Sequence, residues 1–561
     1  MSPKKLFARV LYIAAIVVIF WFVIAFILAP VIGVFYEILF SNGQLSMETI
    51  HKLITSRRVI NALRNTFVMS SFTIVTVSAV GFIQIMLTEY FDIKGSRFLE
   101  AAFSTPLMYG GISLVSGYKY VYSSDGFVTH FLTMIFPTLD VNWFTGFTAI
   151  LFVHTFSMTT CHILFVKPAF RRIDYSIIEA SRNLGATSIT AFFRTALPIV
   201  KPSIFSATIL VTLTALNSFA APSMLGGKNY YMVNSLIQNL LSIGSRDLAA
   251  LLSFILAIAC ILLLLVFRHV EKRGSYVSIS KVTTQMRKVK IRNPLLNAAA
   301  HVLGYALSAI YLLPVASILL FSFTDIRTIV AQSLPTALTI QNYTRVFSRS
   351  DVLKPFMNSV VMSLIAVSIV IILCVAASIA IHKKPGKAST ILEMTLLIPW
   401  ILPATMLVVG MISIYSTPNP LVLYAVLVGG FGILPVTYAV IHIPYAMRLI
   451  RASLYAVNAA HEEAARSLGA NALSTFLRIT LPAILPTVAS VGAITFSGLI
   501  SEYTVSALLY NVNNMPLGIV LRVSDTNTDP YTAANTLVYI VVLMAISAVT
   551  LLITRKSREN Y

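Results

Sequence analysis

The chain has 561 residues, of which 57% are hydrophobic and only 11% are charged, and its formal net charge is +21. Soluble domains carry about 25% charged residues, so the composition excludes a soluble protein of this length. The positive charge does not indicate nucleic-acid binding, because membrane proteins collect Lys and Arg in their cytoplasmic loops. We therefore predict an all-α integral membrane protein that contacts lipid and no nucleic acid.

Twelve apolar stretches follow one another along the chain. Each is long enough to cross the ~30 Å hydrocarbon core of a bilayer as a helix. The first is longer than the ~7–15 residues of a signal-peptide core, so we predict that it remains as a transmembrane helix. The predicted spans are 10–36, 66–88, 98–122, 144–168, 203–224, 247–267, 297–322, 357–382, 391–416, 420–446, 485–509 and 533–554.

A basic stretch that is poor in apolar residues, Arg268 to Asn293, separates the sixth span from the seventh. It predicts two six-helix halves, residues 1–270 and 297–561, joined by a cytoplasmic linker at 271–296. If the N-terminus is inside and the spans alternate, 29 of the 41 Lys and Arg residues fall in cytoplasmic segments. This bias predicts that both termini are cytoplasmic.

An internal repeat relates the two halves. Residues 179–202 read EASRNLGATSITAFFRTALPIVKP and residues 463–486 read EAARSLGANALSTFLRITLPAILP, with eleven of 24 positions identical and no gap. A weaker repeat precedes the second span of each half, where NTFVMS from Asn65 matches NSVVMS from Asn358. The repeats indicate a tandem duplication, with two pseudo-symmetric halves around a central pathway.

Each strong repeat lies in a loop after the fourth span of its half, at 171–198 and at 451–482. Helix-favouring residues lead to Gly185 or Gly469, helix resumes afterwards, and two prolines precede the next span. Small residues around each glycine allow a partner surface to approach closely, and the leading glutamate could pair with a partner arginine. The alternative is an amphipathic loop at the lipid headgroups, which two copies with the same Glu, Gly and Pro spacing disfavour.

This pattern resembles the E-A-A-x-x-x-G loop of the permeases of binding-protein-dependent ABC importers, in a form with both halves fused. The first copy departs from it with Ser181 in place of the second alanine. The resemblance implies a multi-pass protein of the bacterial inner membrane, an extracytoplasmic substrate-binding protein, and two copies of a cytoplasmic ATPase subunit that binds ATP-Mg. It implies ATPase-coupling roles for Glu179, Ala180, Arg182, Gly185, Ala186, Glu463, Ala464, Arg466, Gly469 and Ala470.

The chain itself shows no catalytic or nucleotide-binding motif. The Gly-Lys pairs at 227–228 and 386–387 lack the remaining residues of a P-loop. No C-x-x-C pair indicates a disulfide or zinc framework, since the three cysteines stand singly in apolar runs, at Cys161, Cys260 and Cys374. We predict a transport subunit that is not an enzyme, with no catalytic residue, metal site or cofactor of its own.

The transported substrate is predicted from the same resemblance. The layout most resembles the ferric-iron branch of the family, in the segments 218–227, 334–343 and 502–508. Permeases for 2-aminoethylphosphonate and for thiamine or polyamines remain as alternatives. Two other classes also remain open: an ion-coupled secondary transporter, which would need carboxylates inside the membrane, and an insertase-like protein without transport.

Glu502, near the outer end of span eleven, is the best candidate for the substrate pathway, because ionisable groups inside a membrane are costly and often functional. The repeat aligns Glu502 with Ser218 and Tyr503 with Phe219. We therefore predict a pathway where the two halves meet, formed by Asn217, Ser218, Glu502 and Tyr503. The alternative is a Glu502 side chain that reaches the outer interface.

We predict structural roles for two histidines and three tyrosines. His154 and His162 of span four lie about 12 Å apart along a helix, too far to hold one ion together, and we predict hydrogen-bonded interior groups. Aromatic residues collect at membrane interfaces, so we predict an interfacial belt from Tyr118, Tyr120 and Tyr122.

Overall fold

Helices make up nearly all of the computed structural model, which describes residues 13–559 apart from 15, 42–43, 46–47, 172, 228–229, 273–287, 292, 333–334, 336, 384–385, 458 and 524–528. In this part of the chain ten helices are long and apolar enough to cross a membrane, and two bent helix pairs raise the number of spans to twelve. One pair of two-residue antiparallel strands, β1 (Phe40–Ser41) and β2 (Gln44–Leu45), interrupts them. The predicted all-α membrane fold is confirmed.

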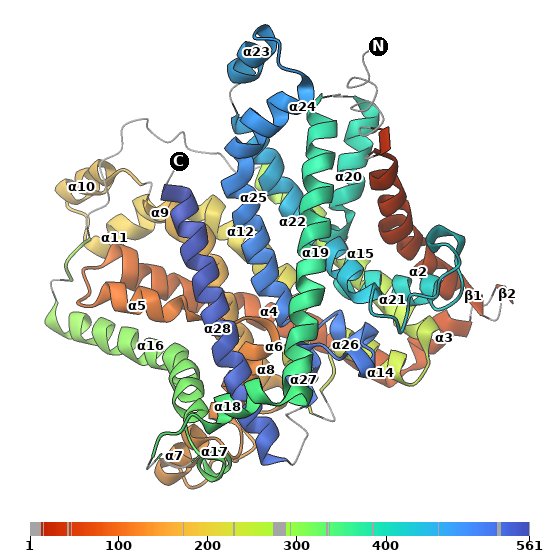
Figure 1. Ribbon diagram of the computed structural model, residues 1–561. Helices are drawn as coiled ribbons and strands as arrows, with labels where there is room; N and C mark the ends of the chain where they lie inside the picture. The colour runs from red at the N-terminus through yellow and green to blue at the C-terminus, as the bar shows by residue number, and fades with distance from the viewer. Residues whose placement is uncertain are drawn as a thin grey trace.

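The elements of the first half lead from the first span to the linker (Figure 1). They are η1 (Ile24–Leu28), α2 (Ala29–Leu39), α3 (Glu48–Thr55), α4 (Arg57–Ile85), η2 (Met86–Tyr90), α5 (Ser96–Phe103), η3 (Thr105–Leu107), α6 (Gly111–Tyr122), α7 (Phe127–Ile135), α8 (Gly146–Met158), α9 (Thr160–Arg171), α10 (Tyr175–Asn183), α11 (Ser188–Ala191), η4 (Phe192–Ala196), α12 (Leu197–Leu216), α13 (Ala220–Leu225), α14 (Val233–Ser242) and α15 (Arg246–Lys272).

The second half begins after the linker, most of which lies outside the described residues. Its elements are α16 (Pro294–Ser322), α17 (Ile326–Ala331), α18 (Gln341–Ser348), α19 (Ser350–Lys383), α20 (Lys387–Ile401), α21 (Ala404–Tyr415), η5 (Pro420–Val422), α22 (Ile433–Ala456), α23 (Ala459–Ser467), α24 (Ala472–Thr475), η6 (Phe476–Thr480), α25 (Leu481–Ile500), α26 (Ser506–Leu509), η7 (Val512–Asn514), α27 (Leu517–Val523) and α28 (Pro530–Glu559).

The third span of each half is broken at an equivalent place. The chain bends by 115° between the helices 96–107 and 111–135, and by 106° between α20 and α21. Pro106 and Pro399 precede these breaks at matching positions, and a proline removes one backbone donor from a helix. In the first half Gly111 continues the chain with a φ of 58°, which a glycine adopts without steric cost.

Several predicted spans have the wrong limits; span eleven, for example, ends at Ile500 instead of 509. Span five ends at Leu216 instead of 224, because the chain leaves the helix at Asn217 and starts the separate short helix α13. Span ten begins at Ile433 instead of 420. After the 3₁₀ turn η5, the residues up to 432 form a loop, since the stretch 420–432 contains three glycines and begins with the second of two closely spaced prolines, which disfavour a helix.

The two halves exchange their first spans. α2 of the first half packs against α21 of the second half, and η1 contacts α20 and α22. In the same way α16 of the second half packs against α5 and α6 of the first half, as the adjacent green and orange helices of Figure 1 show. The described halves therefore share their hydrophobic cores, because buried residues 19–27 cluster with residues 362–509.

Matched hydrogen bonds support the predicted duplication. The Asn65 side chain donates to the carbonyl oxygen of Tyr231 at 3.1 Å, and Asn358 donates to that of Met515 at 3.1 Å. One residue further on, the hydroxyls of Thr66 and Ser359 each accept a backbone N–H, from residues 233 and 517, at 2.8 Å. The weaker of the two sequence repeats thus holds the second span of each half against the chain that follows its fifth span.

Candidate functional site

The two repeated loops form the same turn. Gly185 and Gly469 have φ angles of 93° and 83°, the left-handed conformation that favours glycine. The residue after each glycine donates its N–H to a carbonyl five residues earlier, Ala186 to Ser181 at 3.2 Å and Ala470 to Ala465 at 3.0 Å. This is the hydrogen-bond pattern of a helix that ends in a Schellman motif. The helix-turn-helix predicted for each loop is present.

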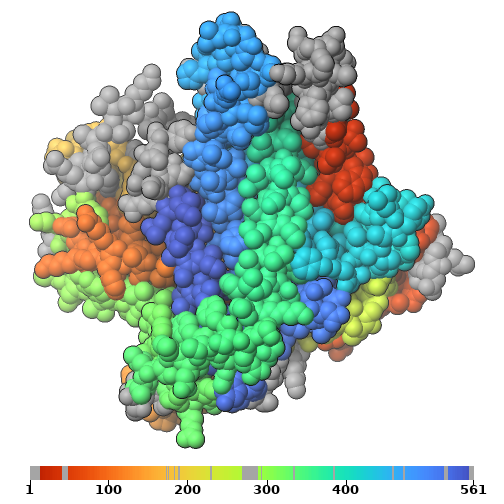
Figure 2. Space-filling view, in the orientation of Figure 1, coloured from red at the N-terminus to blue at the C-terminus, as the bar shows by residue number. Residues whose placement is uncertain are grey.

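The tips of the loops carry exposed apolar side chains. Leu184 is 90% exposed and Leu468, its equivalent in the repeat, is 88% exposed. Glu179 and Glu463 are exposed as well. The second tip projects from the molecule with α23 at the top of Figures 1 and 2. Each tip thus presents an exposed apolar side chain beside a turn with the same backbone shape.

The predicted coupling residues divide into three groups. Four lie exposed on the helices before the turns: Glu179, Ala180, Glu463 and Ala464. Four form the turns: Gly185, Ala186, Gly469 and Ala470. The side chains of Arg182 and Arg466 lie outside the described part of the structure, so their predicted role stays a prediction. The leucines were missed, although the shared L-G-A sequence placed one directly before each glycine.

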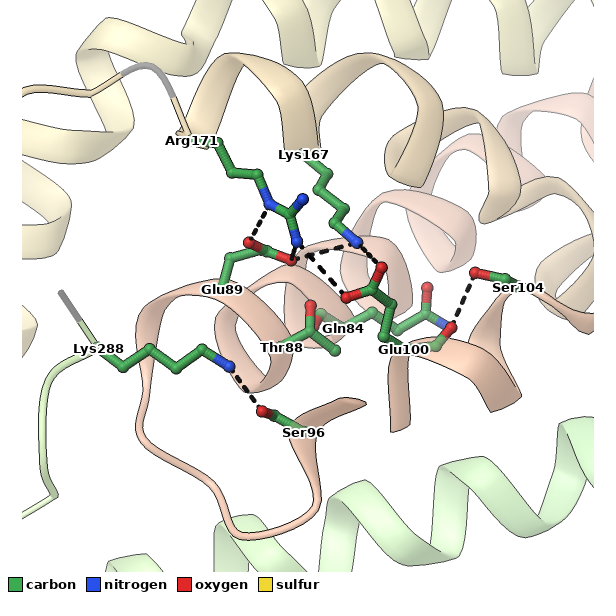
Figure 3. A network of polar contacts seen from close by, with 9 residues as sticks. All are labelled: Gln84, Thr88, Glu89, Ser96, Glu100, Ser104, Lys167, Arg171 and Lys288. Atoms are coloured by element: carbon green, nitrogen blue, oxygen red, sulfur yellow. Dashed lines mark hydrogen bonds and ion pairs between the residues drawn. The ribbon is translucent and has the colours of Figure 1, made fainter. Parts of the chain in front are cut away.

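A network of four charges supports the first loop, where α9 leads into it (Figure 3). The Arg171 guanidinium donates to Glu89 at 2.8 Å and lies 3.6 Å from Glu100. The Lys167 ammonium lies 3.3 Å from Glu89 and also pairs with Glu100. Glu89 is only 7% exposed, so these two cations balance a carboxylate that has lost most of its water.

A smaller arrangement supports the second loop. Arg451, which like Lys167 lies twelve residues before the loop glutamate, pairs with Glu393 of the third span. Arg448 stacks on the Trp400 ring, 3.7 Å from its centroid. Each half therefore has an ion pair between its third span and the end of its fourth. The first half adds a second acid, Glu89, and a second base, Arg171.

The four predicted pathway residues do not form one cluster of mutual contacts. Asn217 donates to the carbonyl oxygen of Leu213 at 3.0 Å, and the Ser218 hydroxyl lies 2.8 Å from His154 Nε2. The Tyr503 ring contacts Phe219 of the other half, with 5.2 Å between centroids. The repeat-related aromatic residues Phe219 and Tyr503 thus meet where the halves join, and the pathway role of the four residues stays a prediction.

Glu502 lies next to this contact and lines a cavity. Its carboxylate accepts backbone N–H bonds from Val505 at 3.1 Å and from Ser506 at 3.2 Å. The cavity has a volume of about 820 Å³ and is bounded by both halves, by the break of span three at 109–113 and by residues of α25 and α28. The sequence did not predict this cavity, because the break at 109–113 belongs to a stretch that reads as a continuous span.

The interior histidines and tyrosines give mixed outcomes. His154 is hydrogen-bonded as predicted, to Ser218 and to the Thr73 hydroxyl. His162 is buried, but neither ring nitrogen has a hydrogen-bond partner among the described residues. The predicted interfacial belt is wrong for Tyr118 and Tyr122, which are buried in the core, because the broken third span lies inside the molecule.

Comparison with known proteins agrees with the duplicated architecture. Residues 113–275 and 383–559 each match the family described as binding-protein-dependent transport system inner membrane component. A probable ABC transporter permease protein of Sinorhizobium fredii is 39% identical over 99% of this chain and 98% of its own. An Fe(3+)-transport system permease protein of Haemophilus influenzae is 25% identical over 96% of this chain and 98% of its own.

Among solved structures, a chain of a bacterial ABC transporter involved in the import of the acidic polysaccharide alginate aligns with 49% of this chain and 99% of its own, with 21% identity and a TM-score of 0.41. The two family matches cover most of the sequence, one in each half, and a relative that is 39% identical aligns nearly from end to end. The chain belongs to the family of binding-protein-dependent transport system inner membrane components, as an ABC transporter permease with both halves fused.

Proposed function

We propose that this chain is the membrane-spanning subunit of a bacterial ABC importer, and that it receives its substrate from an extracytoplasmic binding protein. The observation that carries the proposal is the pair of loops with the same turn and the same exposed leucine, Leu184 and Leu468. Each loop docks on one copy of a cytoplasmic ATPase subunit, which binds ATP-Mg and supplies the energy. Both loops and both termini then face the cytoplasm.

Ferric iron is the proposed substrate. The Haemophilus influenzae relative named for Fe(3+) transport aligns with 96% of this chain, so the likeness extends through both halves and their spans. Its identity of 25% leaves room for a change of substrate. The direct test is uptake of radiolabelled ferric iron, 2-aminoethylphosphonate, thiamine and putrescine by cells with and without the gene. Iron uptake that is unchanged by deletion of the gene would refute the ferric assignment.

The docking role is tested by substituting the exposed leucines. Leu184→Asp and Leu468→Asp put a charge on a surface that must lose water to bind, while the folded chain loses no buried contact. We expect each to lower the amount of ATPase recovered with the purified permease about tenfold, equal to about 1.4 kcal/mol. The double variant should recover no ATPase above background.

The control for this experiment is Leu423→Asp. Leu423 is 93% exposed, and it lies in the loop after α21, away from both repeats in the sequence. It should leave ATPase recovery at the wild-type level. Normal recovery by the double variant Leu184→Asp/Leu468→Asp would refute the assignment of the loops as docking sites.

A further inference from the structure

The charged groups that line the cavity between the halves are of one sign, negative. Glu502 is the only acidic residue among the described residues that line it, and no Lys, Arg or His lines it. Arg522, which donates to the Ser223 carbonyl oxygen at 3.0 Å, is not part of the lining. The other polar lining groups are hydroxyls, from Tyr109, Ser113, Tyr445, Ser497, Ser501, Tyr503, Thr504, Ser547, Thr550 and Thr554.

Open space lies over the backbone at two glycines of the wall. A Cβ atom added at Gly110 or at Gly498 would meet no heavy atom within 4 Å. Gly498 lies on α25, one helical turn before Glu502, so a side chain built there would extend into the cavity beside the carboxylate. The cavity is large enough for a hydrated metal cation or a small organic cation.

The position of the Glu502 carboxylate is fixed by the backbone N–H groups of Val505 and Ser506. No Lys, Arg or His of the described lining offsets its charge, so the net charge of the lining is negative. An anion in the cavity would be repelled, whereas a cation would be attracted by the carboxylate and would meet oxygen atoms on the lining, the kind of ligand that hard cations prefer.

We infer that this cavity is the transit site of the substrate and that its charge selects cations and rejects anions such as phosphonates. The inference rests on the proposed transport function and narrows its substrate class. It keeps ferric iron, polyamines and thiamine as candidates and removes 2-aminoethylphosphonate.

The test varies charge and bulk separately at Gly498. Gly498→Lys and Gly498→Met add side chains of similar length, and only lysine adds a positive charge. Cells that lack the gene and carry each variant are assayed for uptake of radiolabelled ferric iron, putrescine and 2-aminoethylphosphonate. We expect cation uptake to fall at least tenfold in Gly498→Lys and less than threefold in Gly498→Met.

Glu502→Gln gives a second, independent measurement. It keeps one oxygen that accepts the backbone N–H groups and removes the charge, so cation uptake should again fall at least tenfold. Gly432→Lys is the control, because Gly432 also has no neighbour within 4 Å of an added Cβ and does not line the cavity. It should transport at the wild-type rate.

Three results would overturn the inference: equal losses for Gly498→Lys and Gly498→Met, normal cation uptake by Glu502→Gln, or gene-dependent uptake of the phosphonate in place of the cations. Failure of the proposed transport function has a different signature, since the wild-type chain would then recover no ATPase subunit. Recovery of the ATPase with each variant shows that a loss of uptake arises in the cavity and not in assembly.

Discussion

The two repeated loops have the same tips and different supports. At the tips the glycine conformation, the turn hydrogen bonds and the exposed leucine agree between residues 184–186 and 468–470. Behind the tips, the first loop packs on a cluster of buried aromatic and aliphatic side chains that includes Phe170 and Phe192. The second loop instead has a hydrogen bond from the Thr480 hydroxyl to Glu462.

The comparison shows that the two copies keep the same backbone shape at the tips and differ in the residues that support the tips. Under the proposed docking role, a tip needs a defined backbone and a defined surface. A support only has to hold the tip in place, and an apolar cluster or a polar contact can do so. The position before the loop glutamate illustrates the point, since it is the fully buried Ile178 in the first loop and the partly exposed Glu462 in the second.

The largest effect is expected from a substitution that disrupts the apolar support of the first loop. Ile178→Ala removes a buried side chain and leaves a cavity, which typically costs about 2–5 kcal/mol. Glu462→Ala, at the equivalent position, removes a hydrogen bond at a partly exposed site and should cost only about 1 kcal/mol. Hydrogen exchange of the backbone amides of 175–196 and 459–480 measures the local opening free energy of each loop.

The matched control is Ile177→Ala, which removes an exposed side chain next to the buried one and should leave exchange of the first loop unchanged. If Ile178→Ala and Glu462→Ala accelerate exchange equally, the two supports are equivalent and the contrast between them is wrong.

The sequence predicted the tips much better than their supports. The tips depend on local chemistry, because a glycine after a helix-favouring run predicts its turn without knowledge of the rest of the chain. The supports depend on pairs of residues far apart in sequence, such as Glu89 with Arg171. Glu89 directly follows the predicted span 66–88, and nothing in the local pattern identified its partner.

The second prediction compares the ion pairs behind the loops. Glu89→Gln removes the charge of a nearly buried carboxylate and leaves Lys167 and Arg171 with a single acid, Glu100. We expect a loss of about 1–3 kcal/mol, the cost of a buried polar group deprived of its partner. Glu393→Gln breaks an ion pair whose partners are both about one-quarter exposed, and it should cost about 1 kcal/mol or less.

Thermal unfolding of the purified permease measures both effects, with Glu48→Gln as a control for loss of an exposed ion pair to Lys52. The larger effect should fall in the first half, because only there does a second acid sit among two bases. An equal loss for Glu89→Gln and Glu393→Gln would mean that burial of Glu89 adds nothing to the network.

The breaks in the third span of each half are a second feature that the sequence did not predict. Residues 98–122 and 391–416 are apolar enough to be read as continuous helices, and the prolines within them do not by themselves distinguish a kink from a break. The structure bends both by more than 100°, and in the first half the bend brings Tyr109 to the cavity wall. Packing against the exchanged first span of the other half, which no local pattern encodes, accompanies each break: α16 lies on α5, and α2 lies on α21.

The smallest expected effect tests whether the tips are equivalent. Gly185→Ala and Gly469→Ala place a Cβ on a residue with positive φ, which costs about 1 kcal/mol, and neither new atom would meet a neighbour within 4 Å. The cost is therefore conformational and should be the same in both loops, visible as equally faster amide exchange just before each glycine. Gly386→Ala is the control, since its φ of 168° is extended backbone that alanine also adopts and its surroundings are open. Unequal effects at 185 and 469 would show that the different supports alter the conformational freedom of the tips, and the two proposed docking surfaces would then no longer be copies of each other.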